Sequence, residues 1–416
     1  MIQTLHPLLA EWPSCSRKPV KLQVSNSGIA SLHRGHPWLY AERIKSESHR
    51  GQPGDLAVVF DAKKRFVAVG LYDPFLPIRM RALRASKPGP IDRAFFAERI
   101  AKALARRRPL LQTQTDGYRM IHGESDGLPG MVIDRYAGTA VVKLYTCAWL
   151  PHLYDCLEIL LEQQPLERIV LRISRGMQQQ TAYLRGLEDG QILYGEPINE
   201  TLICRENGLI FEVDPIRGQK TGFFLDQRDN RARVEKLAKG RRVLNAFSYN
   251  GGFSLAAARG GATEVTSLDQ SGPALESSIR NFALNAAVPA IAAARHLTIE
   301  DDAFKALAEL IKQGKQYQLV IIDPPAFAVR RAQVAEALVA YGRLAQLGVS
   351  LLAPGGDIVL ASCSNPVSPE DFRQAVCYAA ARAGRPLRQL EETSHALDHP
   401  LDFAESRYLK CLFATA

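Results

Sequence analysis

The sequence contains no run of about 18 apolar residues, no Cys-x-x-Cys pair and no internal repeat. The first absence removes the usual signal of a transmembrane helix, and the second weakens zinc and thiol-redox interpretations, so no metal is expected. The seven cysteines are an odd and sparse set, typical of reduced thiols rather than of a disulfide framework. The N-terminus lacks a basic segment followed by an apolar core, which argues against a signal peptide. We therefore expect a cytoplasmic protein without a membrane partner.

The charge balance is moderately basic. Lys and Arg number 52 against 43 Asp and Glu, which gives a net charge of +9 over 416 residues. Such an excess permits a polyanionic partner, but a solubility role explains it equally well. Apolar residues at 46% and charged residues at 23% are ordinary for a globular protein, and the length fits about two to four domains.

Three regions differ in their pattern of apolar and polar residues, and we predict domains at 19–88, 91–200 and 201–416. In the first, short apolar runs at 56–60 and 66–71 flank a polar turn, a pattern that predicts a hairpin in a small β-barrel. The second alternates helical and strand patterns and predicts an α+β domain, with helices at 91–104 and 150–161 and strands at 130–134, 139–144, 169–173 and 191–193.

An arginine run at 106–108 follows the first helix of the middle region. Cations are favourable at a helix C-terminus, so a solvated helix end is at least as good an interpretation as a nucleic-acid contact.

The third region predicts an α/β fold of the Rossmann-like kind. The expected strands are 242–247, 264–268, a weak one at 290–293, 318–322 and 357–361, and the expected helices are 253–259, 272–284, 332–352 and 369–383. Alternating strands and helices indicate a parallel sheet covered on both faces, which explains the continuous apolar strand at 319–322. Ligands of such sheets bind beyond the carboxyl ends of the strands.

The loops after the first three strands suit a nucleoside ligand. Gly251 and Gly252 allow a sharp turn after the first strand, without the G-x-G-x-x-G pattern of dinucleotide folds. Asp269 follows the second strand, where a carboxylate can accept both ribose hydroxyls or simply cap the next helix. Residues 300–304 follow the third strand and combine carboxylates with Phe304. This combination is typical either of an adenine-binding loop or of the start of a helix.

The loops after the last two strands carry the reactive groups. Asp323-Pro-Pro-Ala-Phe327 is a rigid loop that can present a carboxylate and a carbonyl group to a planar base, although Asp323 could also be a helix cap. Cys363 lies between two serines at the end of the fifth strand. It can be interpreted either as a nucleophile or as a small residue that fills space in the core.

Three further segments make the sequence resemble a known family. These are Leu32–Trp38, Arg119–Gly130 and Gln219–Arg228, together with the loops at Asp323 and Cys363. The chain resembles, over about residues 20–416, the bacterial PUA-domain class I methyltransferases that form 5-methylcytosine in large-subunit rRNA. The resemblance implies an RNA-binding PUA barrel, a central α+β domain and a Rossmann-like methyltransferase domain. It leaves residues 1–18 without an assignment.

The resemblance implies S-adenosylmethionine as the cofactor and 23S rRNA as the partner. The implied cofactor-binding residues are Gln227, Phe247, Ser248, Tyr249, Asn250, Gly251, Asp269, Gln270, Ser271, Asp302 and Asp323. We expect RNA to be bound by Arg34, His36 and Trp38 in the segment that resembles the PUA opening, by the basic cluster Lys63, Lys64 and Arg65, and by Pro324 and Phe327 of the rigid loop. Members of this family often form homodimers, and the residues themselves give no indication of the oligomeric state.

The expected mechanism uses Cys363 as a nucleophile and Asp323 as a partner of the cytosine edge. The groups that deprotonate the thiol and that remove the carbon-5 proton stay unassigned. Two alternatives remain open at this point. One is a methyltransferase that modifies a base nitrogen such as guanine N7, which needs no thiol. The other is an RNA-binding factor in ribosome assembly that has no catalytic activity.

Overall fold

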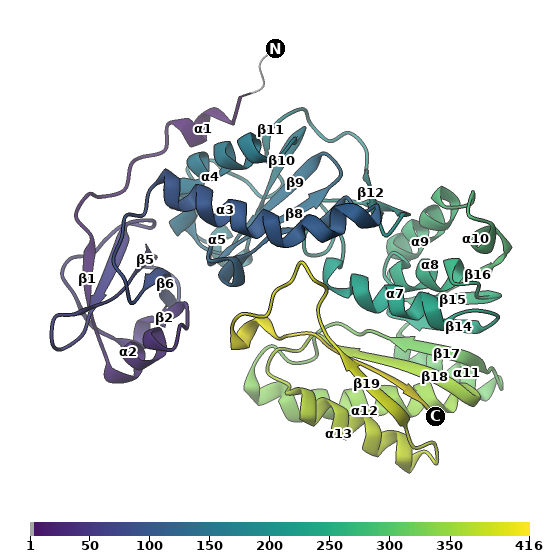
Figure 1. The fold of residues 1–416 in the computed structure, drawn as a ribbon. Helices are drawn as coiled ribbons and strands as arrows, with labels where there is room; N and C mark the ends of the chain where they lie inside the picture. The colour runs from purple at the N-terminus through teal and green to yellow at the C-terminus, as the bar shows by residue number, and fades with distance from the viewer. Residues whose placement is uncertain (1–3) are drawn as a thin grey trace. The chain divides into compact units, whose positions relative to one another are not determined.

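The computed structural model describes residues 4–416, which form two compact units (Figure 1). Unit 1 runs to Cys204 and adds Val213–Phe223 and Pro400–Phe403. Unit 2 comprises Arg205–Glu212, Phe224–His399 and Ala404–Ala416. The three domain boundaries expected from the sequence stay a prediction beside this two-unit division. Within residues 4–416, no helix combines the length and the apolar character that crossing a bilayer requires.

The first part of unit 1 is a six-stranded sheet in the order β2-β6-β5-β4-β1-β3. Its strands are β1 (Val20–Val24), β2 (Trp38–Tyr40), β3 (Ile44–Glu47), β4 (Leu56–Phe60), β5 (Phe66–Tyr72) and β6 (Ile78–Ala85), with helix α2 at Asn26–His33. The expected hairpin between β4 and β5 is confirmed. Asp61 fixes its turn, because Oδ1 accepts hydrogen bonds from the backbone N–H groups of Lys63 and Arg65, each at 2.8 Å.

The second part of unit 1 is a five-stranded sheet in the order β11-β10-β9-β8-β7. Its strands are β7 (Gly117–His122), β8 (Met131–Tyr136), β9 (Thr139–Leu144), β10 (Arg168–Ile173) and β11 (Ile192–Tyr194). Helices α3 (Arg93–Arg107) and α4 (Leu150–Gln163) pack with it around one apolar core, and α5 (Arg175–Gln178) and α6 (Thr181–Leu184) are short. The helix α1 (Pro7–Ala10) buries Leu9 in the same core, so the N-terminal extension helps to close it.

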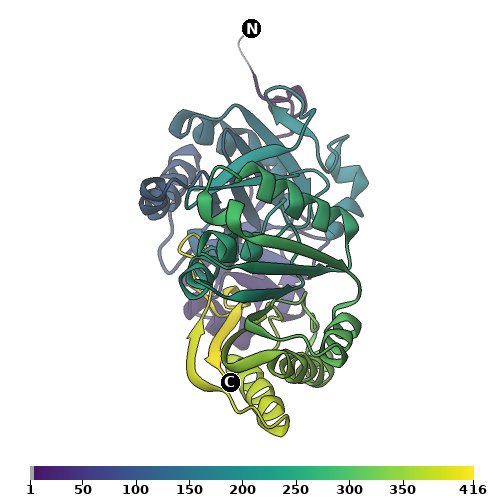
Figure 2. The same cartoon turned by 90° about the vertical axis from the view of Figure 1, so that its right-hand side faces the viewer.

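Unit 2 is built on a seven-stranded sheet in the order β16-β15-β14-β17-β18-β20-β19. Its strands are β14 (Arg242–Ala246), β15 (Glu264–Asp269), β16 (Arg295–Glu300), β17 (Tyr317–Ile322), β18 (Leu352–Ser362), β19 (Arg388–Thr393) and β20 (Lys410–Thr415). The first five are parallel, whereas β20 pairs antiparallel with both β18 and β19. The yellow C-terminal strands lie at one edge of this sheet (Figure 2).

Helices cover both faces of the unit 2 sheet, as the alternating sequence pattern predicts (Figure 1). One face carries α7 (Arg228–Leu237), α8 (Gly252–Arg259) and α9 (Gly272–Leu284), and the other carries α11 (Ala303–Lys312), α12 (Val334–Ser350) and α13 (Pro369–Arg382). Ser368 caps α13 by accepting from Asp371 N–H at 3.0 Å. A two-stranded hairpin of β12 (Leu202–Glu206) and β13 (Leu209–Val213) precedes the seven-stranded sheet in the chain.

Two expectations for this region were incomplete or wrong. Residues 290–293 are not a strand but lie in helix α10 (Pro289–Ala293), because proline suits the first helical position and alanine favours helix. The third strand is instead β16, whose residues are largely exposed because it is an edge strand, so it shows no apolar run. The sequence also gave no signal for β19, whose first five residues are all exposed.

The arginine run at 106–108 ends α3 with Arg106 and Arg108 exposed, as a solvated helix end predicts, whereas Arg107 between them is buried. Arg107 is 1% exposed, and its guanidinium forms an ion pair with buried Asp126 at 2.7 Å. It also donates to the carbonyl oxygens of Ala103 and Arg119, each at 2.9 Å. Sequence alone could not distinguish this arginine from its neighbours, because its partner lies on a segment that only the fold brings close.

Candidate active site

A strained loop at residues 247–251 follows β14. Phe247 and Tyr249 have φ angles of +61° and +49°, in the left-handed region that non-glycine residues rarely adopt. Gly251 has a φ angle of +79°, and a Cβ atom there would lie 2.1 Å from the Oγ atom of buried Ser278. Only glycine meets both demands, so it allows the chain to turn directly from β14 into α8 at the sheet edge.

Asp269 at the end of β15 holds this loop in place. Its Oδ2 atom accepts from Tyr249 N–H at 2.8 Å, and its Oδ1 atom accepts from Ser271 N–H at 3.0 Å. Ser271, not Asp269, caps α9, and Gln270 between them is exposed. A carboxylate offers about four acceptor sites, so Asp269 retains capacity for the two hydroxyl groups of a ribose.

The loop after β16 contains the residue expected to contact adenine. Asp302 is exposed and caps α11, because its Oδ1 atom accepts from Lys305 N–H at 3.0 Å. The helix-cap interpretation is therefore confirmed for Asp302, and its contact with adenine stays a prediction.

The loop residues fit an adenosine-bearing cofactor. The hydroxyl group of Ser248 is buried, and its Oγ atom has no hydrogen-bond partner within residues 4–416. Such a group is costly unless a ligand satisfies it. Neighbouring Asn250 is held by Asn281, which donates to its carbonyl oxygen at 2.9 Å. The loop thus combines a fixed backbone, a small residue at the turn and an unsatisfied hydroxyl group beside the Asp269 carboxylate.

A chain of side-chain hydrogen bonds positions Asp323 after β17. Gln227 donates to Asp323 Oδ2 at 3.0 Å, and Gln227 in turn accepts from Asn230 at 2.6 Å. Asn230 also accepts from the hydroxyl group of Thr393 on β19 at 2.6 Å. Gln227 is therefore oriented toward Asp323, and its contact with the cofactor stays a prediction. Sequence reasoning missed Asn230 and Thr393; the spacing of Asn230, one helical turn after Gln227, was the available signal for the former.

Cys363 lies beside the Asp-Pro-Pro loop, as expected from the strand order. Its Sγ atom is 3.9 Å from the carbonyl oxygen of Pro324, and its side chain is half-buried. The neighbouring Ser364 is buried and accepts from Ala328 N–H at 3.0 Å, which ties the loop after β18 to the loop after β17. The structure thus brings the thiol and the Asp323 loop together.

Lys410 is a site residue that sequence reasoning missed. It lies on β20 opposite Ser362, and its buried Nζ atom donates to the carbonyl oxygens of Ser364 at 2.6 Å and Tyr408 at 2.9 Å. Burial lowers the pKa of Lys410 to about 8, while its electrostatic interaction with Cys363 acts in the opposite direction. The Lys410 ammonium group therefore lies within electrostatic range of the Cys363 thiol. Its signal in the sequence is a single charge at the start of an apolar C-terminal strand.

The ring of Phe327 packs against other aromatic rings of the protein. It is half-buried, and its ring centroid lies 5.0 Å from that of Tyr341 and 6.3 Å from that of Phe304. Pro324 is buried. Their contacts with a substrate base stay predictions.

The expected RNA-binding residues of unit 1 lie on its first sheet and before β2. Lys63, Lys64 and Arg65 are exposed at the tip of the β4–β5 hairpin, where Arg65 forms an ion pair with Asp61 at 2.7 Å. Arg34 is also exposed, whereas Trp38 is half-buried and donates from Nε1 to Glu124 at 2.7 Å. His36 packs edge-on against Trp38, with 5.7 Å between the ring centroids.

Two family descriptions match this chain. Residues 120–411 match the family described as S-adenosylmethionine-dependent methyltransferase, and residues 22–84 match the PUA-like domain.

Full-length relatives and a solved structure are also similar. A ribosomal RNA large subunit methyltransferase of Deinococcus radiodurans is 50% identical over 406 residues, which cover 96% of this chain and 98% of that protein. A ribosomal RNA large subunit methyltransferase I of Shewanella amazonensis is 36% identical over 404 residues, with coverages of 95% and 99%. The crystal structure of a candidate methyltransferase complexed with SAH aligns with a TM-score of 0.80 at 22% identity, covering 95% of this chain and 100% of that chain.

Proposed function

The chain belongs to the family of S-adenosylmethionine-dependent large-subunit rRNA methyltransferases with a PUA-like domain, and we propose that it methylates carbon 5 of a cytosine in 23S rRNA through Cys363. S-adenosylmethionine is the cofactor, and it supplies an electrophilic methyl group. The target atom and the covalent route are our proposal.

The residues at the carboxyl edge of β14 and β15 would hold this cofactor. Ser248 and the turn at Gly251 would bind its methionine part, and Asp269 would accept the ribose hydroxyl groups. Asp302 at the start of α11 would accept from the adenine amino group through the carboxylate capacity that the helix cap leaves.

Cys363 would solve the low reactivity of the cytosine ring. Its thiolate forms a bond to carbon 6, and the electrons of the carbon 5–carbon 6 double bond become available at carbon 5 for methylation. Loss of the carbon-5 proton then re-forms the double bond and expels the Cys363 thiolate. This splits one difficult displacement into two easier steps.

Lys410 and Asp323 would support the thiol and the base. A thiolate is favoured by a nearby cation, and Lys410 provides one that two carbonyl groups hold in place. Asp323, oriented by Gln227, would face the polar edge of the cytosine and, as the protonated acid, donate to N3 where negative charge develops. The base would have to leave its stack to reach this site.

The observation that carries the proposal is the position of Cys363, 3.9 Å from the Pro324 carbonyl oxygen. A methyltransferase that modifies a base nitrogen needs no thiol there, and a factor without catalytic activity would leave rRNA unmodified.

The test compares Cys363→Ala with Cys377→Ala, which removes another half-buried thiol on α13. We expect Cys363→Ala to abolish methylation of a 23S rRNA transcript, with S-adenosylmethionine affinity retained in calorimetry. Cys377→Ala should keep both properties. Methylated cytosine from the Cys363→Ala protein would refute the covalent route, and methyl transfer to a different atom by the wild-type enzyme would refute the target.

A further inference from the structure

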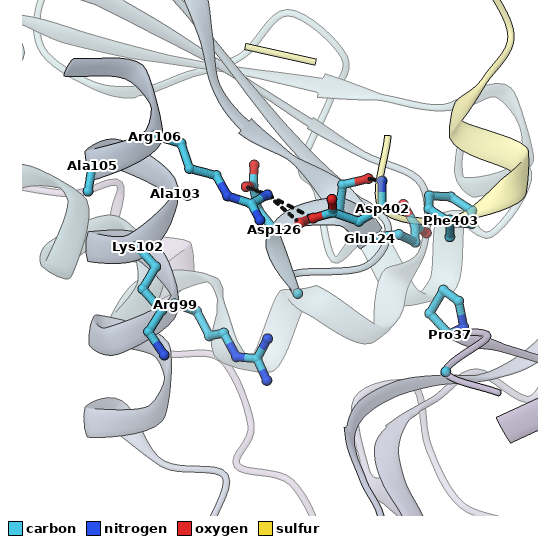
Figure 3. Close-up of a pocket in the computed structure, with 13 residues that line it drawn as sticks. Pro37, Arg99, Lys102, Ala103, Ala105, Arg106, Glu124, Asp126, Asp402 and Phe403 are labelled. Carbon is cyan, nitrogen blue, oxygen red and sulfur yellow. Dashed lines mark hydrogen bonds and ion pairs between the residues drawn. The ribbon is translucent and has the colours of Figure 1, made fainter. Parts of the chain in front are cut away.

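Unit 1 contains a cavity of about 690 Å³ that the proposed methyl transfer does not use (Figure 3). Its walls come from α3, from the short 3₁₀ helix Gly123–Asp126, from Gly35 and Pro37, and from the segment that contains Asp402 and Phe403. Part of the motif at residues 119–130 that the sequence singled out therefore lines it. A cavity of this size accommodates a small-molecule ligand such as a nucleotide.

One wall is cationic. Arg99, Lys102 and Arg106 project from the same side of α3, as Figure 3 shows. Arg106 is neutralised, because it pairs with Asp126 at 3.3 Å and with Asp402 at 2.9 Å. Lys102 is 71% exposed and pairs with Glu98 on its own helix, not with a carboxylate of the cavity. Lys102 and Arg106 thus both have carboxylate partners, and the charge left to a ligand is mainly that of Arg99.

Arg99 is held in place as a cation. Its guanidinium lies over the Phe95 ring at 5.1 Å, and it donates to the Leu83 carbonyl oxygen at 3.2 Å. Gly127 makes room for it, because a Cβ atom there would lie 2.0 Å from Nη1. Arg84 lies over the same ring at 4.6 Å, so two like charges share one site. A bound anion would relieve their repulsion.

The acidic side chains of the cavity have partners other than Arg99, although Glu124 keeps its charge because its donor is a neutral indole. Asp126 forms an ion pair with buried Arg107 at 2.7 Å, and Glu124 accepts from Trp38 at 2.7 Å.

The facing wall carries the rings of Pro37 and Phe403 beside the carboxylates of Glu124 and Asp402. Pro37 and Phe403 lie opposite α3 in Figure 3. Trp38 supports Phe403 edge-on, with 5.5 Å between ring centroids and an interplanar angle of 72°. Aromatic rings of this kind stack nucleobases without regard to their identity.

We infer that this cavity binds one unpaired nucleotide of the RNA substrate, with its phosphate against Arg99 and Lys102 and its base against Phe403. The inference rests on the proposed function, which makes RNA the substrate. The cavity would thus fix the position of a single-stranded segment on unit 1, away from the residues that hold the cofactor.

The test measures binding of a fluorescein-labelled, unstructured 12-nucleotide RNA by anisotropy over a range of salt concentrations. Lys102→Glu should weaken binding about tenfold at low salt and reduce the slope of log affinity against log salt by about 0.7 to 1. The matched control is Lys312→Glu, because Lys312 is 75% exposed and pairs with a glutamate on its own helix; its affinity should change less than twofold. Phe403→Leu should weaken binding about fivefold or more with an unchanged salt slope, because stacking releases no counterions.

Other outcomes are decisive as well. RNA affinities of Lys102→Glu and Phe403→Leu equal to that of the control would overturn the inference, even with methylation intact. Displacement of the labelled RNA by micromolar uridine monophosphate would assign the cavity to a free nucleotide instead and would also overturn it. If the wild-type protein methylated no cytosine while these variants still lost RNA binding, the proposed function would fail and the inference would stand.

Discussion

Replacing Gly251 by alanine tests whether the turn after β14 shapes the cofactor site. The new Cβ atom would lie 2.1 Å from Ser278 Oγ and 2.9 Å from Ser278 Cβ. The substitution also places alanine at a φ angle of +79°, which costs about 1–2 kcal/mol for a residue other than glycine. Overpacking a buried site adds about 1–3 kcal/mol, so Gly251→Ala should destabilise the protein by about 2–5 kcal/mol.

Two further variants separate these contributions. Gly314 has a φ angle of +66°, and a Cβ atom added there would meet no atom within 4 Å, so Gly314→Ala carries the backbone cost alone. Ser278 Oγ is buried without a hydrogen-bond partner in the described part of the chain, so Ser278→Ala loses no hydrogen bond and removes the nearest clash. The double variant Gly251→Ala/Ser278→Ala should therefore recover part of the lost stability.

The assays are urea unfolding and calorimetric titration with S-adenosylmethionine. We expect Gly251→Ala to weaken cofactor binding at least tenfold, because the turn must shift to relieve the clash, while Gly314→Ala binds like the wild type. Equal destabilisation by Gly251→Ala and Gly314→Ala, together with unchanged cofactor affinity, would refute the reasoning.

The remaining predictions concern charged residues. Asp126→Ala leaves the Arg107 guanidinium buried without its main partner and should cost about 3–5 kcal/mol in urea unfolding, whereas removal of the exposed Glu98 carboxylate should be nearly neutral; equal effects would contradict the buried ion pair. Lys410→Met should slow alkylation of Cys363 by iodoacetamide at pH 7 several-fold, measured by peptide mass spectrometry, and an unchanged rate would exclude a role in activating the thiol. Burial lowers the pKa of Lys410 from 10.5 to about 8, so between these values the unfolded chain binds more protons and the contribution of this residue to stability rises with pH. Thermal unfolding near pH 8 and pH 10 should show that rise in the wild type relative to Lys410→Met, and parallel pH profiles would contradict it.

Several parts of the protein were predictable because their signals are local. The central strands β17 and β18 of unit 2 contain apolar runs, and Ser368 with Pro369, Glu370 and Asp371 marks the start of α13. The positions of Gly251, Asp269, Asp323 and Cys363 after successive strands then followed from one topological rule, that parallel strands deliver their loops to the same edge.

Other parts were decided only by the tertiary structure, since they depend on partners far apart in sequence. Arg107 forms a buried ion pair because the fold places Asp126 against α3. The residues next to Arg107 in the sequence do not indicate this pairing. Lys410 contacts the backbone of Ser364, the residue after Cys363, because β20 pairs antiparallel with β18, which a pattern of alternating parallel strands does not predict. The sequence by itself thus determined the fold class and the order of the reactive loops. The tertiary structure decided which charges are available, because availability depends on burial and on long-range partners.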